Sequence, residues 1–261
     1  MDIGISSSCF YPTLTEEAFK TVGELGAKSA EIFFNSSEEL HGSILKRITD
    51  IKDYYGIDVR TIHPFTSFAE PFMLFGGYER RVSEAVEFYK RYFEAACALG
   101  SEAVVIHGGF RSQAADEAAY FESFSRLCET AREYGIFAAH ETVVEKAGSD
   151  IEFLKRLKAF LGQDFKLIID TKQCRRSKTD EYEYIKLFGD DIIQIHISDY
   201  NESKDCIPPG EGEYEFKKLF SSLKSVGYNK SAVIELYSWG FSDIAQIEKS
   251  RIYLENIDRN C

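Results

Sequence analysis

The sequence predicts an α/β fold, a closed (β/α)8 TIM barrel in which a single domain spans residues 1–261. Six apolar runs of strand length each end in a residue that can ligate a metal or move a proton. These end residues are His63, His107, Glu141, Asp170, His196 and Glu235. They lie 44, 34, 29, 26 and 39 positions apart. One strand, helix and return strand needs roughly 30 residues or more, so the spacing indicates repeated units of this kind.

An open, doubly wound sheet shows the same alternation of strands and helices and is the alternative. An open sheet collects its ligands at one switch point, whereas here consecutive runs each supply a polar end. A barrel brings such ends together at one mouth. The length of 261 residues, with 44% hydrophobic side chains, is sufficient for the core of one barrel. The closed barrel is therefore favoured.

The first two units begin the chain. Strands are predicted over Ile3–Ser7 and Ser29–Phe34, where the residues are mainly apolar. Two pairs match the capping box that starts a helix: Thr13 with Glu16, and Ser36 with Glu39. We therefore expect a helix between the two strands and a second helix that ends at Tyr55.

Glycines divide the rest of the chain at regular points. Each follows an apolar or aromatic residue and precedes a predicted strand, and the set is Gly26, Gly56, Gly100, Gly135, Gly162, Gly189 and Gly227. Glycine accepts the left-handed conformation that ends a helix, so seven helices followed by strands are expected.

Two helices have the clearest apolar faces. The fourth carries apolar residues at helical spacing, namely Tyr120, Phe124, Leu127, Ala131 and Tyr134. The eighth is predicted from about Asp243 to Ile257, with an apolar set of Ile244, Ile247, Ile252 and Leu254.

Composition excludes several classes of partner. A net charge of −12 opposes binding to nucleic acid or anionic lipid over most of the surface. No apolar run approaches the ~20 residues that a membrane span needs, so no membrane contact is expected. The six cysteines form no Cys-x-x-Cys pair and are predicted to be free thiols in a reducing compartment. A soluble, cytoplasmic protein is expected.

Four strand-end residues form a predicted metal site: Glu141, Asp170, His196 and Glu235. Three carboxylates and one imidazole suit Mn, Mg, Co or Zn better than a metal that prefers thiolates. Carboxylates brought this close repel one another unless a cation lies among them. Alternatively, each of these residues only forms hydrogen bonds to a neighbouring loop. This is reasonable for any one of them, but it is improbable that four adjacent strands would all end in a possible metal ligand by chance.

Several other polar residues lie near the predicted mouth. His63 and His107 bind a second metal bridged by Glu141, hydrogen-bond a substrate, or are core residues satisfied by their neighbours. His140 points to the opposite face of its strand from Glu141, and we expect it to be structural. Glu31 is a further candidate at the mouth. Asp199 either supports the site or contacts substrate.

The rim of the mouth offers aromatic and basic side chains. Phe65, Phe68, Phe72, Tyr237 and Trp239 form either an apolar wall for a sugar or loop packing. Four basic residues follow the fourth and sixth predicted strands: Arg111, Lys172, Arg175 and Arg176. They either bind a phosphate or carboxylate on the substrate or, taken one by one, are solvated surface residues.

The chain resembles the xylose isomerase-like TIM barrels, a group that contains sugar phosphate isomerases and epimerases, inosose dehydratases and endonuclease IV. The resemblance rests on His63-Pro64, His107-Gly108-Gly109, Glu141, Asp170, His196-Ile-Ser-Asp199, Gly210-Glu-Gly212 and Glu235. It implies that Glu141, Asp170, His196 and Glu235 hold one divalent cation, and that Glu141 and Glu235 act as an acid/base pair.

Endonuclease IV members carry further histidines, and the chain departs from them at two places. Gln173 stands where one such histidine is expected, and Lys204-Asp205-Cys206 replaces an expected Asp-x-His element. Together with the acidic composition, these departures argue against DNA repair.

The function expected from these residues is a metal-dependent isomerase or epimerase of a small sugar, polyol or sugar phosphate. One glutamate would remove a proton next to a carbonyl, the cation would stabilise the enediolate, and the other glutamate would return a proton. The predicted substrate-binding residues are His63, His107, Gln173, Asp199 and Trp239. An endonuclease IV-like phosphodiesterase and a catalytically silent sugar-binding barrel are the alternatives, and a homo-oligomer is allowed.

Overall fold

The computed structural model describes residues 1–261, and its centre is a closed barrel of eight parallel strands. The strands are β1 (Asp2–Ser6), β2 (Ser29–Phe33), β3 (Asp58–His63), β4 (Ala103–Ile106), β5 (Phe137–Glu141), β6 (Leu167–Asp170), β7 (Ile192–Ile197) and β8 (Ser231–Ile234). They pair in sequence order, and β1 pairs with β8 to close the ring. The predicted fold class is confirmed.

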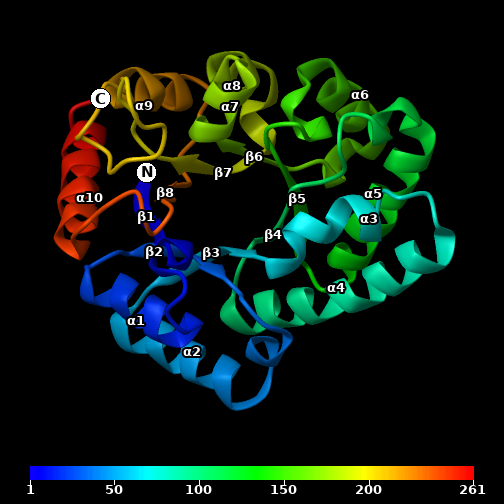
Figure 1. The fold of residues 1–261 in the computed structure, drawn as a ribbon, viewed down its shortest axis with the longest axis horizontal. Helices are drawn as coiled ribbons and strands as arrows, with labels where there is room; N and C mark the ends of the chain where they lie inside the picture. Colours follow the sequence, from blue (N-terminus) through cyan, green and yellow to red (C-terminus); the bar gives the residue numbers. More distant parts are fainter.

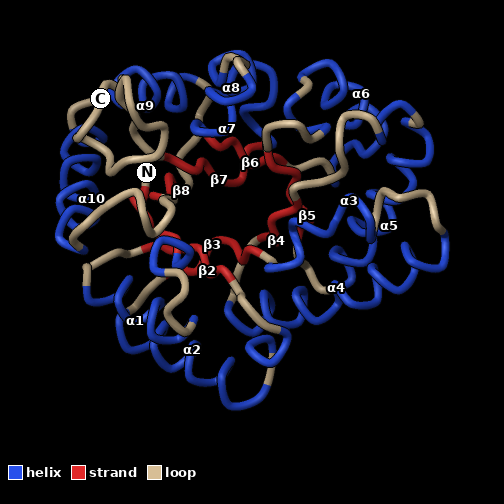
Figure 2. The backbone as a smooth tube through the Cα atoms, in the orientation of Figure 1, coloured by secondary structure: helices blue, strands red, loops and turns tan.

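Helices surround this ring (Figures 1 and 2). They are α1 (Thr15–Glu24), α2 (Gly42–Tyr55), α3 (Glu70–Met73), α4 (Glu79–Leu99), α5 (Glu117–Glu133), α6 (Ile151–Leu161), α7 (Thr171–Ser177), α8 (Glu181–Phe188), α9 (Phe216–Ser225) and α10 (Ile244–Arg259). Two of them, α3 and α7, are short additions between a strand and its main return helix. The N-terminal ammonium lies 3.0 Å from Asp258 on α10, which joins the two ends of the chain.

Most glycine predictions are confirmed by backbone conformation. Six of the seven glycines have φ between 59° and 77°, a range that favours glycine, and Gly56 and Gly100 adopt the left-handed conformation that ends a helix. Gly189 is the exception, because its φ of −42° keeps it right-handed and it begins a 3-10 turn, Gly189–Asp191. The turn supplies the change of direction before β7 without a left-handed residue.

Both predicted capping boxes are wrong. Leu14 precedes α1 and makes no side-chain cap, and Ser36 caps a 3-10 turn, Ser37–Leu40, rather than α2. The Glu39 carboxylate instead accepts hydrogen bonds from the Thr15 hydroxyl at 2.9 Å and from the Asn35 backbone N–H at 2.7 Å. A long-range contact therefore takes the side chain that the local pattern assigned to a helix start.

The main core lies between the barrel and the helices. In α5 the predicted residues Tyr120, Phe124, Leu127 and Ala131 are all buried. In α10 the apolar face is narrower than predicted, since Ile247 and Leu254 are buried while Ile244 and Ile252 are 45% and 44% exposed. Only one side of α10 faces the barrel, and its other side faces solvent.

The barrel interior is divided between apolar and polar side chains. A small apolar cluster comes from β4 to β7, and it consists of Ala103, Val105, Ala139, Ile168 and Ile193. Buried polar residues from the other strands form a hydrogen-bonded network, with Glu31, Thr61 and Gln194 at its centre. This network lies beneath the polar strand ends and connects to His196.

Gly108, two residues after the end of β4, provides a test of the packing between this strand end and α5. Its φ is 80°, and a β-carbon there would overlap the Tyr120 hydroxyl and the His140 ring. Gly100 has a similar φ of 72° but no neighbour that a β-carbon would meet. We expect Gly100→Ala to lower the free energy of unfolding by about 1 kcal/mol. Gly108→Ala should cost about 1 to 3 kcal/mol more because of overpacking. Urea unfolding of both variants measures the difference, and equal losses would contradict it.

Candidate metal centre and active site

The four predicted metal ligands converge at the C-terminal mouth of the barrel. Glu141 ends β5, Asp170 ends β6, His196 lies in β7 and Glu235 follows β8. One donor atom from each lies within 4.8 Å of those of the other three. All but Glu235 are buried, and Glu235 is partly buried. Residues up to 94 positions apart along the chain, Glu141 and Glu235, thus meet around one point.

The donor set fits a divalent cation. Glu141 Oε2 and Asp170 Oδ2 are buried oxygen atoms without a well-aligned hydrogen-bond donor, and their near partners are the His107 imidazole at 3.0 Å and the Lys172 ammonium at 3.2 Å. The other oxygen of Asp170, Oδ1, accepts the backbone N–H of Gln173 at 3.0 Å as the cap of α7, and this bond orients the carboxylate. Buried carboxylate oxygens without donors are costly unless a positive charge lies near them. Three carboxylates and one imidazole are suited to Mn, Mg, Co or Zn.

His196 is held by carboxylates on both of its ring nitrogens. Nδ1 lies 3.0 Å from Glu141 Oε1, and Nε2 lies 2.9 Å from Glu31 Oε2. Burial opposes the positive charge, but the Glu31 and Glu235 carboxylates raise the pKa of the imidazole well above its ordinary value. A carboxylate behind the distal nitrogen fixes the orientation of a histidine that ligates a metal. Glu31, a candidate mouth residue in the sequence, therefore positions His196 from below.

Glu141 is shared with a second cluster of donors. His107 Nε2 lies 3.0 Å from Glu141 Oε2 and 3.0 Å from His63 Nε2. One donor atom each of His63, His107 and Glu141 lies within 4.8 Å of the other two. Burial alone would raise the pKa of Glu141, but His107 and His196 hold it well below its usual value. Both histidines predicted to bind substrate or a second metal are thus adjacent to the main cluster.

Glu235 has a different cationic partner, Lys172. The Lys172 ammonium lies 3.0 Å from Glu235 Oε2 and 3.2 Å from Asp170 Oδ2, and its side chain is only 4% exposed. Although burial favours the neutral carboxyl, Lys172 and His196 lower the pKa of Glu235 to about 2. The sequence allows Lys172 either a contact with an anionic group of the substrate or a solvated surface position. Its ammonium instead lies between two predicted metal ligands.

His140 faces away from the cluster. Its Nε2 lies 2.9 Å from the Tyr120 hydroxyl of α5, and its Nδ1 lies 3.1 Å from the Glu141 carbonyl. Burial lowers the pKa of this imidazole to about 4, so it is neutral in the folded protein near pH 7. These contacts agree with the structural role expected from strand alternation.

The remaining predicted substrate contacts lie around the centre. The Asp199 carboxylate accepts four backbone N–H groups, those of Tyr200, Gly210, Gly212 and Tyr214. These bonds commit Asp199 to supporting the loop that follows β7. Gln173 Oε1 accepts the Val144 N–H at 3.3 Å. Trp239 is 62% exposed and stacks on Tyr237, with ring centroids 5.0 Å apart.

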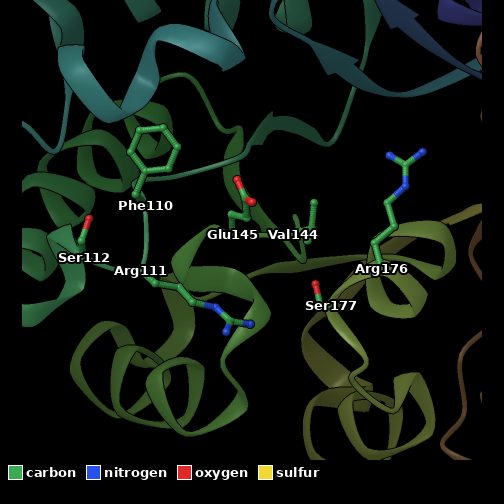
Figure 3. Close-up of a pocket in the computed structure, with 7 residues that line it drawn as sticks. All are labelled: Phe110, Arg111, Ser112, Val144, Glu145, Arg176 and Ser177. Carbon is green, nitrogen blue, oxygen red and sulfur yellow. The ribbon is translucent and has the colours of Figure 1, made fainter.

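A cavity of about 450 Å³ lies on the rim, lined by Phe110, Arg111, Ser112, Val144, Glu145, Arg176 and Ser177 (Figure 3). Arg111 and Arg176 lie on opposite sides of it, with Glu145 and Val144 between them. Arg111 donates to Ser149, whereas Arg176 donates to Asp205 and to the Tyr237 hydroxyl. Arg175, the third arginine considered for anion binding, lies over the Tyr200 ring, with its Cζ atom 3.5 Å from the ring centroid.

The predicted aromatic wall is only partly formed. Phe68 and Phe72 are 76% and 61% exposed, whereas Phe65 packs against Tyr92 in the core, with ring centroids 6.3 Å apart. The exposed aromatic rings therefore come from two segments, one between β3 and α4 and one after β8.

Glu70 is a buried acid for which the sequence has no recognisable pattern. It begins α3 and accepts the Tyr89 hydroxyl and the Gly108 backbone N–H, each at 2.7 Å. These bonds fasten the loop after β3 next to His107. Burial raises the pKa of Glu70 to about 7. The surrounding sequence is a mixed loop without periodicity, so it contains no local signal for a buried carboxyl group.

Comparison with known proteins identifies related chains. A family model described as xylose isomerase-like TIM barrel matches residues 19–257. An uncharacterized protein of Methanocaldococcus jannaschii is 24% identical over 250 residues, which cover 90% of this chain and 83% of that protein. No helix in the structure has the length and apolar character required to cross a membrane.

Three solved structures share the fold along the whole chain. A D-tagatose 3-epimerase-like protein has a TM-score of 0.80 at 22% identity, with 100% of this chain and 98% of that one covered. The 3-keto-D-glucoside 4-epimerase of E. coli has a TM-score of 0.79 at 20% identity over 100% of both chains. D-psicose 3-epimerase of Clostridium cellulolyticum H10 has a TM-score of 0.78 at 16% identity, covering 100% of this chain and 99% of that one. At these identities the matches establish a common fold.

The raised pKa of Glu70 predicts a specific dependence of stability on pH. The folded carboxyl binds its proton more tightly than the unfolded one, so the stabilisation is present below about pH 4.5 and is lost as pH rises through about 7. Wild type should therefore lose on the order of 3 kcal/mol of unfolding free energy from this group between pH 4.5 and pH 8, whereas Glu70→Gln, which has no proton to lose, should not. The stability of the variant relative to wild type should rise by that amount over the same pH range. Urea unfolding at the two pH values measures this gain. A difference between the proteins that does not change with pH would refute the assignment.

Proposed function

The chain belongs to the xylose isomerase-like TIM barrel family, and we propose that it is a divalent-metal-dependent isomerase or epimerase of a small sugar, polyol or sugar phosphate. The observation that carries this proposal is the convergence of Glu141 and Glu235 with Asp170 and His196 at one mouth. Structures that share the fold include proteins named as sugar 3-epimerases and a keto-glucoside 4-epimerase. Their names support the same class of reaction here.

Four residues would hold the cation: Glu141, Asp170, His196 and Glu235. When bound, a divalent cation supplies Lewis acidity, which polarises a substrate carbonyl and lowers the energy of negative charge on its oxygen. Glu141 Oε2 and Asp170 Oδ2 are buried carboxylate oxygens whose near partners are the His107 imidazole and the Lys172 ammonium, and this concentration of negative charge supports the assignment.

Glu141 and Glu235 are suited to transfer protons from two sides of a bound substrate. The pKa of each is below its usual value, despite burial, because of His107 near Glu141 and Lys172 near Glu235. Each carboxylate is therefore ionised near pH 7 and able to accept a proton. They come from β5 and from the end of β8, with the β6 and β7 ligands between them. One would remove a carbon-bound proton, and the other would deliver a proton to the opposite face or the neighbouring carbon.

The substrate contacts proposed for this reaction are His63, His107, Gln173 and Trp239. His63 and His107 lie next to Glu141, where ring N–H groups can donate to substrate hydroxyls. Gln173 and Trp239 lie further out, on α7 and in the loop after β8. An exposed indole on this rim is available to pack against the apolar face of a sugar.

A second candidate function follows from the His63, His107 and Glu141 cluster. If this cluster holds another cation, the two ions bridged by Glu141 would suit a phosphodiesterase. The net charge of −12 opposes a nucleic acid substrate, and Gln173 lacks the metal-ligating nitrogen of a histidine. The sugar reaction remains the better match.

Replacing either glutamate tests the proton transfer. Glu141→Gln and Glu235→Gln should each reduce solvent-deuterium exchange into a ketohexose or ketose phosphate substrate by roughly 10²- to 10⁴-fold. Mass spectrometry of the recovered sugar measures the exchange. Glu102→Gln is the matched control, because Glu102 pairs with Lys230 at 2.9 Å and lies just before β4, at the opposite end of the barrel. Exchange at the wild-type rate in either active-site variant would rule out that glutamate as a base.

Metal dependence has a readout that does not require a substrate. Protein stripped by chelation should gain roughly 5 to 10 °C in Tm when Mn²⁺ is added to about 100 times its Kd. Asp170→Asn keeps an oxygen to cap α7 but removes the charge, so its Tm should barely respond. Elemental analysis gives the number of ions bound, and two per chain would favour the phosphodiesterase. An unchanged Tm in wild type with all of Mn²⁺, Mg²⁺, Co²⁺ and Zn²⁺ would exclude the metal site.

A further inference from the structure

Lys172 is the only lysine or arginine that forms a salt bridge with the four candidate metal ligands. It is the second residue of α7, which begins immediately after Asp170, so the helix carries its side chain back over the mouth. The ammonium lies 3.2 Å from Asp170 Oδ2 and 3.0 Å from Glu235 Oε2. Its side chain is 4% exposed, and the Tyr237 ring covers it with the centroid 4.8 Å from Nζ.

The lysine contacts the oxygen that Asp170 has available for a cation. Asp170 Oδ1 accepts the N–H of Gln173, which leaves Oδ2, the atom that faces Lys172, as the oxygen available to a cation. Glu235 Oε2, the other atom that Lys172 contacts, also lies 3.7 Å from His196 Nδ1, so it faces the centre of the cluster. A divalent ion that binds these oxygens would therefore lie close to the ammonium and be repelled by it.

Charge in the cluster explains why a lysine is stable there. Glu141, Asp170 and Glu235 bring three carboxylates into a buried site, which is unfavourable without positive charge. The ammonium offsets part of this charge when no metal is bound. It is also unavailable to an anionic substrate, because its hydrogen-bonding positions face two carboxylates and an aromatic ring.

We propose that Lys172 competes with the divalent cation for Asp170 and Glu235. Its ammonium holds the two carboxylates together in the metal-free protein and weakens metal binding, so that the metal is exchangeable. This inference rests on the proposed metal site, and it adds a residue of this chain that sets the affinity of that site.

Metal affinity is the direct test. Chelator-stripped wild type, Lys172→Met and Lys172→Gln are titrated with Mn²⁺ by calorimetry or by competition with a chelating dye. Both variants lack the positive charge, and Lys172→Gln keeps a polar group if the methionine variant does not fold. We expect each to bind Mn²⁺ at least about tenfold more tightly than wild type, which corresponds to about 1.4 kcal/mol. Lys172→Arg, which retains the charge, should bind as weakly as wild type.

Lys146→Met is the matched control. Lys146 is also a buried lysine near the mouth, but its ammonium lies 3.9 Å from the centre of the Phe110 ring and makes no salt bridge with a candidate ligand. Its Mn²⁺ affinity should equal that of wild type. Metal-free Tm values provide a second readout, since Lys172→Met should be less stable than wild type without metal and should recover when Mn²⁺ is added. A lysine with only a structural role would lower Tm equally in both states.

The outcomes separate this inference from the proposed function. Equal or weaker Mn²⁺ binding by both uncharged variants, with metal-dependent exchange intact in wild type, would overturn the role of Lys172 alone. Tighter binding by Lys172→Arg as well would also overturn it, because charge would not be the cause. If neither wild type nor the uncharged variants bind Mn²⁺, Co²⁺ or Zn²⁺, the metal site and the competition both fail. Metal binding only in the uncharged variants would be the strongest support.

Discussion

The repulsion among three buried carboxylates is the constraint on which the mouth of this barrel depends. Glu141, Asp170 and Glu235 lie at the C-terminal ends of β5, β6 and β8. Because these strands are parallel, the three side chains meet at the same mouth of the barrel. Such a cluster is tolerated only where positive charge or hydrogen-bond donors surround it. His107 contacts Glu141, and Lys172 contacts Glu235. His196 lies near both glutamates.

This constraint extends into the barrel interior. Glu31 binds the far nitrogen of His196, and Thr61 and Gln194 donate to the same carboxylate at 2.8 and 3.0 Å. A barrel interior is usually filled by branched apolar side chains. Here one side of it is polar, because the imidazole at the mouth needs a fixed orientation and its supporting carboxylate needs donors of its own.

The two glutamates proposed as the acid/base pair are not equivalent. Glu141 contacts imidazoles, which can exchange protons with it, whereas Glu235 contacts an ammonium that stays charged. The surrounding loops are fixed by other carboxylates, with Asp199 accepting four backbone N–H groups and Glu70 fastening the loop after β3. The proposed acid/base pair is thus surrounded by loops that other buried carboxylates hold in place.

The sequence by itself determined the barrel, the six polar strand ends and most helix ends, because apolar runs, their spacing and glycine stops are local properties of the chain. Tertiary structure alone decided which partners those side chains have. Glu31 and His196 are 165 residues apart, and Lys172 and Glu235 are 63 apart, so no local pattern relates them. The same reason explains why Glu39 accepts a hydrogen bond from the Thr15 hydroxyl instead of completing a capping box. It also explains why Asp199 accepts backbone N–H groups of the loop that follows it. Local sequence governs backbone direction, whereas side-chain pairing depends on distances that exist only once the ring has closed.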